Sequence, residues 1–308
     1  MFSDYSWTEL GSIFAMQGFA GLSLFSVYLL MALGLAIIFG QMGVINMAHG
    51  EFMILGAYVT YLCSGFVQLH LPFLFGGYFF LAIVVAFFVT ALLGALVEWI
   101  LIRHLYQRPL DTLLATWGLS LILQQTYRTV FGAREVGVDL PSWMLGSISA
   151  TDLVDIPING LVVMSITLLI ALGVYLLMFR SRFGRQTRAV VQNRGMAGAV
   201  GINTEKVDRL TFSLGCGIAG VAGSAFTMVG STGPTAGQLY IVDTFLVVVF
   251  GGAASLLGTV ASAFTISQAQ STLEFFLSGS MAKVLTLVAV VIILMLRPQG
   301  LFASKVRR

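Results

Sequence analysis

Residues 33–61 read LGLAIIFGQMGVINMAHGEFMILGAYVTY, in which two apolar runs are separated by the more polar GQMGVINMAHGE. The surrounding sequence is nearly free of charge, because His49 is the only residue of a charged type between Glu9 and Glu51. A helix needs about 20 apolar residues to cross the hydrocarbon core of a bilayer. The first run, extended upstream, therefore predicts a membrane span over residues 18–39, and the interruption predicts a break after it.

The composition of the whole chain is typical of a membrane protein. Of its 308 residues, 58% are hydrophobic and 9% are charged, whereas a soluble domain carries about 25% charged residues. A soluble globule cannot bury so much apolar surface. We therefore expect an all-α fold, a polytopic transmembrane helix bundle that forms a single domain over residues 1–308.

Nine membrane spans are expected, with eight or ten as the alternatives. Pro72, Gly76 and Gly77 divide the charge-free run between Glu51 and Glu98 into two helices, because proline and glycine interrupt helices. The N-terminus of this scheme is external. The expected spans cover residues 18–39, 52–68, 73–102, 112–127, 158–179, 210–229, 239–250, 259–277 and 284–296.

Positive charge sets the expected orientation in the membrane. Residues 180–209 contain seven Lys and Arg residues against Glu205 and Asp208. Because cytoplasmic loops are enriched in Lys and Arg, we place this segment, the basic patch at Arg103 and the C-terminal tail RPQGLFASKVRR in the cytoplasm. The acidic loop over residues 134–155 is then external.

Glycine, with 34 residues, has two possible roles in this chain. Small residues let membrane helices approach closely, which is the general expectation for the glycines of residues 215–223. Glycine and proline also interrupt spans where transporters bind their solute, in corresponding positions of two halves. Residues 40–50 and 230–258 are interrupted in this way and are candidates for such a pair.

Three stretches resemble a known family. LGLAIIFGQMGVINMAHGEFMILGAYVTY resembles the first conserved block of the permease subunits of branched-chain amino acid type ABC importers, and LRPQGLF is similar to their ending. STGPTAGQLYIVDTFLVVVFGGAASLLGT resembles the second block of the urea-specific branch. The resemblance implies a bacterial inner-membrane complex with a second, related permease, two cytoplasmic ATP-binding subunits and an extracytoplasmic solute-binding protein.

The chain has no GxxxxGK[ST] phosphate-binding motif, so we expect it to bind no cofactor directly and ATP to be used by partner subunits. QNRGMAGAVGIN, within the basic segment, reads as a short helix with a small-residue face. In the resembled family the matching segment is the coupling helix, which docks in a groove of the ATPase. The alternative is an ordinary loop whose arginines only set topology. The coupling positions are Asn193, Arg194, Met196, Ala197, Gly198, Ala199, Val200 and Gly201.

Polar residues in the broken segments are the candidates for the solute path. A small polar solute that loses its water needs the hydrogen-bond partners that such residues offer. For Glu51 and Asp243 the alternative is a position at a helix N-terminus, where negative charge is favourable. Glu98, Glu274 and Lys283 are better interpreted as interfacial or paired charges. The candidates are Asn46, His49, Glu51, Thr235, Gln238 and Asp243.

The distribution of charge favours a neutral solute. Urea offers N–H donors and one carbonyl, whereas an amino acid brings a carboxylate and an ammonium group that each need a partner. No Lys or Arg precedes Arg103, and none lies between Arg209 and Lys283. We therefore expect a urea importer permease, with a branched-chain amino acid importer permease or a passive channel for a small neutral solute as alternatives.

Enzyme and metal functions are not expected. No His-Glu-x-x-His motif or paired Ser and Lys nucleophile motif lies in a span, although an intramembrane enzyme needs such groups. Cys63 and Cys216 lie in apolar stretches without nearby His, which is typical of packing residues and not of a metal site.

Overall fold

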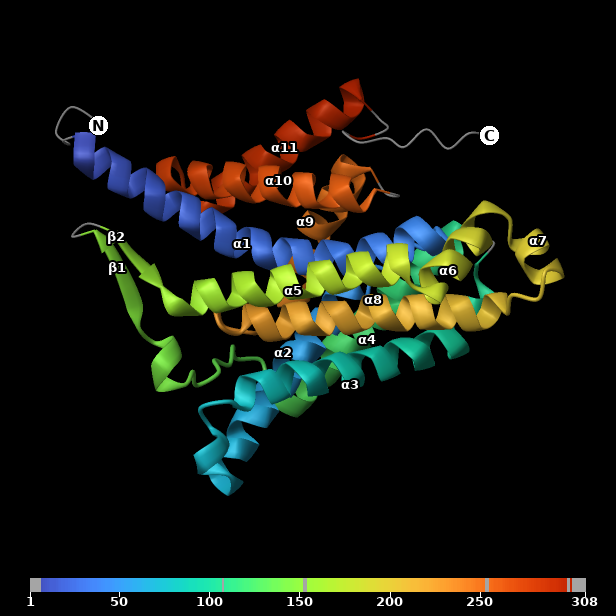
Figure 1. Ribbon diagram of the computed structural model, residues 1–308, viewed down its shortest axis with the longest axis horizontal. Helices are drawn as coiled ribbons and strands as arrows, with labels where there is room; N and C mark the ends of the chain where they lie inside the picture. Colours follow the sequence, from blue (N-terminus) through green and yellow to red (C-terminus); the bar gives the residue numbers. More distant parts are fainter. Residues whose placement is uncertain (1–6, 107, 152–153, 253–254, 298–299, 301–308) are drawn as a thin grey trace.

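A computed structural model describes residues 7–106, 108–151, 154–252, 255–297 and 300 as a long bundle of helices with one small hairpin (Figure 1). The 3-10 helices are η1 (Pro72–Leu74), η2 (Ile102–His104) and η3 (Ser142–Met144), and the antiparallel strands are β1 (Ser147–Thr151) and β2 (Val154–Pro157). The α-helices are α1 (Trp7–Met42), α2 (His49–His70), α3 (Tyr78–Ile100), α4 (Pro109–Phe131), α5 (Ile158–Arg180), α6 (Arg182–Gln192), α7 (Arg194–Ala199), α8 (Thr204–Phe226), α9 (Ala236–Gly251), α10 (Leu256–Phe276) and α11 (Gly279–Leu296).

The prediction of an all-α polytopic membrane bundle is confirmed. Each expected span overlaps one long helix, namely α1 to α5 or α8 to α11. Among the described residues, five helices are long and apolar enough to cross a membrane, and they are α1, α2, α3, α5 and α11. The helix α9 is apolar but shorter, and α4, α8 and α10 carry more polar residues, so the count of nine crossings stays a prediction.

The helices end where local chemistry requires it. Pro109 occupies the first turn of α4, where a missing backbone N–H costs nothing. Gly132 ends the same helix with a φ of +89°, a conformation that favours glycine. Ser181 and Asn203 accept a backbone N–H at the starts of α6 and α8, which satisfies one of the free donors there.

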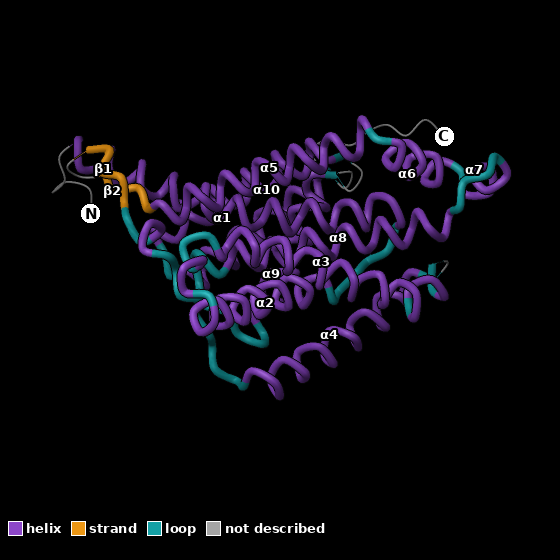
Figure 2. The backbone as a smooth tube through the Cα atoms, turned by 60° about the horizontal axis from the view of Figure 1, so that its bottom comes forward, coloured by secondary structure: helices purple, strands orange, loops and turns teal. Residues whose placement is uncertain are grey.

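The helix α8 lies between α1, α2 and α3 (Figure 2). Its glycines permit this, because a Cβ on Gly223 would overlap the carbonyl oxygen of Met53 in α2. A Cβ on Gly217 would lie 2.7 Å from the ring of Phe87 in α3. The prediction that these glycines serve close helix packing is confirmed. On the other side of α1, α10 packs along it and α9 and α11 flank α10 (Figure 1).

Elements expected on opposite sides of the membrane lie at opposite ends of the bundle. The hairpin and the start of α1 are at one end, and α6 and α7 are at the other (Figures 1 and 2). At the hairpin end, Trp143 donates to the carbonyl of Gly76 at 2.7 Å. At the other end, Arg103 pairs with Glu205 at 3.2 Å. The hairpin itself was not expected, and the C-terminal tail lies almost wholly outside the described residues.

Candidate functional site

The two interrupted segments of the sequence meet inside the bundle. The helix α2 begins at His49 after the stretch that follows α1, and α9 begins at Ala236 after the stretch that follows α8. Here the two backbones touch, because a Cβ on Gly50 would overlap the carbonyl of Gly237. A Cβ on Gly237 would likewise lie 2.7 Å from the carbonyl oxygen of Gly50. Two helix N-termini therefore converge at one point, which we call the α2–α9 junction.

Asn46 and His49 are buried at the first side of this junction. The side-chain oxygen of Asn46 accepts the backbone N–H of Ala48 at 3.1 Å, which turns the chain into α2. Nε2 of His49 lies 3.1 Å from the carbonyl oxygen of Met31 in α1. Since a carbonyl only accepts, this nitrogen carries a proton.

Glu51 stands in the first turn of α2, as the helix N-terminus alternative expected. Its carboxylate nevertheless caps no backbone group of that helix. It accepts hydrogen bonds from Ser120 at 3.1 Å and Gln124 at 2.8 Å, both in α4, and the hydroxyl of Tyr127 donates to the backbone carbonyl of Glu51. Sequence reasoning missed these partners, although their spacing along one face of an expected span was a usable signal.

Several buried polar atoms at the junction have no hydrogen-bond partner in the part of the chain that the structure describes. They are Nδ2 of Asn46, Nδ1 of His49, Oε2 of Glu51 and the hydroxyl of Tyr58. Buried polar atoms are nearly always paired. Together these atoms offer both donors and acceptors, so they are suited to a small polar solute that has left water.

Thr235 and Gln238 are exposed at the start of α9, apart from this buried cluster. Asp243 also lies apart from it, two turns into α9 and buried, so the alternative that it caps a helix N-terminus is wrong. Its Oδ2 pairs with Nζ of Lys283 in α11 at 2.6 Å and lies 2.9 Å from the hydroxyl of Tyr28 in α1.

The ion pair of Asp243 and Lys283 corrects the charge argument made from sequence. Lys283 is distant along the chain but supplies a cation to α9, because α11 folds back beside it. Its ammonium also donates to the carbonyl of Leu239 at 3.1 Å. The spans therefore contain a fixed pair of opposite charges, and the apparent lack of cations no longer favours a neutral solute. The expectation that Lys283 is a paired charge is confirmed.

The short helix expected within residues 192–203 is present as α7, and a further helix that was not predicted, α6, precedes it. The helix α6 ends at Gln192, and Asn193 then caps α7 by accepting the N–H of Met196. Ala197 is buried against Val190 and Val207, which anchors α7 to the bundle. The remaining coupling positions of α7 are exposed.

An ion-paired cluster joins this segment to the helices behind it. Arg194, the first residue of α7, pairs with the buried Asp208 of α8 at 2.5 Å and lies 5.1 Å from the ring of Tyr106. The hydroxyl of Tyr106 donates to the buried Glu98 of α3 at 2.5 Å, and Arg209 pairs with the same carboxylate at 3.2 Å. Glu98 is thus a paired charge, as expected. We call these five residues the α7-end cluster.

The environment of Asp208 shifts its titration. Asp208 precedes the span expected over residues 210–229, and burial raises the pKa of its carboxyl, whereas the charge of Arg194 opposes this rise. A cavity of about 800 Å³ lies beside the cluster, between Met42 at the end of α1, Arg103 and Arg194.

Residues 18–296 match the family described as branched-chain amino acid transport system / permease component. The chain belongs to this family. It is therefore a permease component of a transport system and not an enzyme. The family that the sequence resembled is confirmed, and this match covers both sides of the α2–α9 junction.

Individual relatives match nearly the whole chain. Identity is 29% over 300 residues to the high-affinity branched-chain amino acid transport system permease protein LivH of Escherichia coli K12, covering 94% of this chain and 95% of LivH. It is 27% to BraD of Pseudomonas aeruginosa, with 91% and 93% covered. It is 27% to the probable LivH of Methanocaldococcus jannaschii, with 90% and 88% covered. No solved structure matches the chain significantly.

These relatives bear on the expected solute. All three are named as branched-chain amino acid permeases. None is named for urea, so the branched-chain alternative fits this permease family member better than urea does.

Proposed function

We propose that this chain is a membrane-spanning permease subunit of an ATP-driven ABC importer and that its α2–α9 junction lines the solute path. The observation that carries the proposal is the contact of Gly50 with Gly237, which brings two helix N-termini together beside unpartnered polar atoms of Asn46, His49 and Glu51. Interrupted helices that meet within a bundle are the usual construction of a solute site in transporters. Thr235, Gln238 and Asp243 extend the path along α9.

The partners follow from the two ends of the bundle. At the end that holds α7, the exposed Met196 and Val200 offer apolar side chains to a groove of a cytoplasmic ATP-binding subunit. Two such subunits, a second related permease and an extracytoplasmic binding protein complete the complex. This chain acts as one membrane domain and binds no cofactor itself, since the partners use the ATP. The complex resides in the bacterial inner membrane, with the C-terminus in the cytoplasm.

A branched-chain amino acid is the proposed solute. The named relatives support it, and so does the pair of Asp243 and Lys283, because a zwitterion needs a partner for each of its charges. Urea is the second candidate. It is favoured by the resemblance of residues 231–259 to the urea-specific branch and by the uncharged donors and acceptors at the α2–α9 junction.

The test is uptake of labelled leucine and labelled urea by vesicles that contain the whole complex. ATP-dependent leucine uptake that unlabelled urea does not inhibit is expected. ATP-dependent urea uptake without leucine uptake would select the second candidate. Uptake that continues without ATP would instead identify a passive channel, and vesicles carrying hydrolysis-deficient ATP-binding subunits are the matched control.

A further inference from the structure

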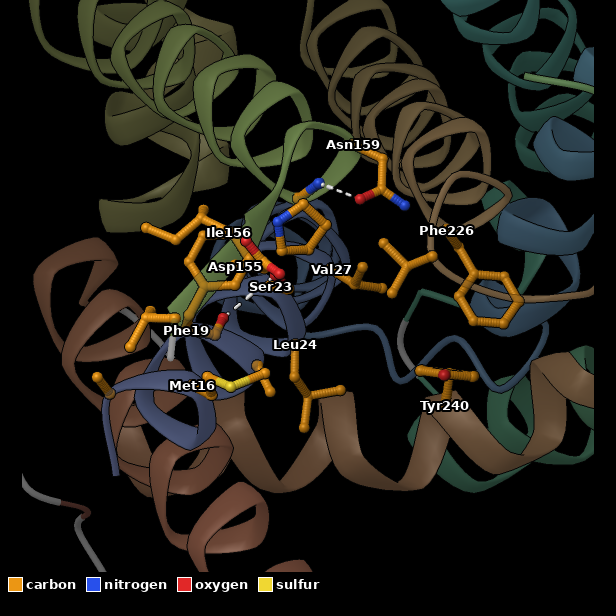
Figure 3. A pocket seen from close by; sticks show the side chains of 16 residues that line it. Met16, Phe19, Ser23, Leu24, Val27, Asp155, Ile156, Asn159, Phe226 and Tyr240 are labelled. Carbon is orange, nitrogen blue, oxygen red and sulfur yellow. Dashed lines mark hydrogen bonds between the residues drawn. The ribbon is translucent and has the colours of Figure 1, made fainter. Parts of the chain in front are cut away.

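A second candidate site lies toward the hairpin end of the bundle, where a cavity of about 450 Å³ opens between α1, β2, the start of α5, the end of α8 and α9 (Figure 3). Its volume is in the range of small-molecule sites. The walls are mostly apolar, and their large side chains come from elements far apart in the sequence. These are Met16, Phe19, Leu24, Val27, Phe226 and Tyr240.

Three polar side chains in the wall, those of Ser23, Asp155 and Asn159, already make hydrogen bonds within the protein. Ser23 donates to the carbonyl of Phe19, and Asp155 accepts the hydroxyl of Ser149 at 2.7 Å. Asn159 donates to the carbonyl of Met228 and accepts the N–H of the next residue, both at 2.8 Å. A polar solute would lose its hydration here and gain little in return, whereas an apolar group would gain by leaving water.

The cavity is next to the interruption between α8 and α9. Phe226 is the last residue of α8 and Tyr240 stands early in α9, and their rings are 5.0 Å apart. On another side, the ammonium of Lys283 lies 5.8 Å from the ring of Tyr240. Tyr240 therefore borders both an apolar cavity and the ion pair that Lys283 makes with Asp243.

We propose that this cavity is the subsite for the branched apolar side chain of the solute, and that Tyr240 separates it from the charges that attract the amino and carboxyl groups. The inference rests on the proposed function and deepens it. A hydrocarbon side chain matches the walls, and the zwitterionic head matches Lys283 and Asp243. Urea has no group that such a cavity would bind. The cavity thus selects among amino acids after the binding protein has released them.

The experiment changes the size of the cavity in both directions. Ala20 lines the cavity but is exposed, so Ala20→Phe fills the space from its edge. Leu24→Ala enlarges it. Ala269→Phe, at an exposed position of α10 outside the cavity wall, is the matched control. Turnover of leucine, valine and alanine is measured with the whole complex and with the binding protein saturated by each solute.

Ala20→Phe should lower leucine turnover about tenfold relative to alanine turnover. Leu24→Ala should lower the preference for leucine over valine. The reason for both is that one methylene group in an apolar pocket changes selectivity by about 10- to 200-fold. Ala269→Phe should leave both ratios unchanged. Wild-type leucine turnover together with unchanged ratios in both cavity variants would overturn the subsite but leave the proposed function standing. Release of a bound lipid by Ala20→Phe with unchanged ratios would also overturn it. A wild-type complex that carries no leucine would refute the proposed solute and the subsite together.

Discussion

Gly50 at the start of α2 and Gly237 at the start of α9 are in backbone contact, and neither position has room for a Cβ. The contact joins two segments that lie far apart in the chain. It places the buried Asn46, His49 and Glu51 beside the start of α9. The α2–α9 junction is therefore specified by glycine on both sides.

Substitution of either glycine should separate the two helices. Gly50→Ala or Gly237→Ala should destabilise the protein by about 1–3 kcal/mol, the usual cost of overpacking. Gly118→Ala in α4 is the control, because its Cβ would meet open space, and it should gain up to about 1 kcal/mol from helix propensity. Thermal unfolding of the purified protein measures both effects. Equal stability of all three variants would show that the junction is not tightly packed.

The ion pair between Asp243 of α9 and Lys283 of α11 should respond differently to removal of each partner. Lys283→Met leaves the buried Asp243 without a cation, so the free energy of unfolding should fall, by less than the about 3–5 kcal/mol of a fully buried pair because Lys283 is one-third exposed. Adding Asp243→Asn to the Lys283→Met variant should restore the abundance of the protein. Asp243→Ala should lower solute uptake more than abundance, and Asp243→Asn less so because it keeps an acceptor. Wild-type uptake by Asp243→Ala would remove this residue from the path.

Bulky residues on α7 should block the coupling step without harming the fold. A Cβ on Gly198 meets nothing within 4 Å, so Gly198→Trp fits this chain. With Ala199→Trp, it should leave membrane insertion intact and abolish ATP-dependent uptake. Gly173→Trp, on an open face of α5, is the control. Normal uptake by both α7 variants would show that ATP-binding subunits dock elsewhere.

The pair of Arg194 and Asp208 should transmit movements of α7 to α8. Arg194→Gln and Asp208→Asn should each leave the ATP-binding subunits bound but reduce uptake per ATP hydrolysed. Stability should fall by less than the about 3–5 kcal/mol of a fully buried pair, since Arg194 is half exposed. Unchanged coupling efficiency in both variants would make the pair merely structural.

The same pair predicts a pH effect with a definite sign. Because burial raises the pKa of Asp208 in the folded state, its stabilising contribution is greatest in acid and is lost as the pH rises through that pKa. Asp208→Asn stays neutral, so its melting temperature relative to wild type should increase from acid to neutral pH. A difference that is constant with pH, or of the opposite sign, would contradict the raised pKa.

Topology is testable at two exposed positions. Ser142 lies in η3 near the hairpin and Asn193 precedes α7, at opposite ends of the bundle. In a background with Cys63→Ser and Cys216→Ser, an impermeant thiol reagent added outside should label Ser142→Cys and spare Asn193→Cys. The reverse pattern would invert the membrane orientation.

Short-range information in the sequence determined the helices. Apolar runs of bilayer length gave the spans, and Pro72 marked one of the boundaries because proline cannot continue a helix from within. The sequence also indicated the family, since two of the three stretches that resemble it include the interrupted segments. The hairpin over β1 and β2 was not predicted, because strands of five and four residues are too short to give a clear alternating pattern.

Only the tertiary structure decided which polar residues act together. Sequence placed Asn46, His49 and Glu51 in one group, but it did not show that Ser120 and Gln124 of α4 bind the carboxylate of Glu51. It also suggested that Asp243 lacked a cation, whereas Lys283 reaches it from α11. Hydropathy and spacing indicate how each helix meets the membrane. Side-chain pairing across a bundle depends instead on the rotation and register of one helix against another. Close glycine contacts, such as that of Gly50 and Gly237, fix this register only in the folded chain.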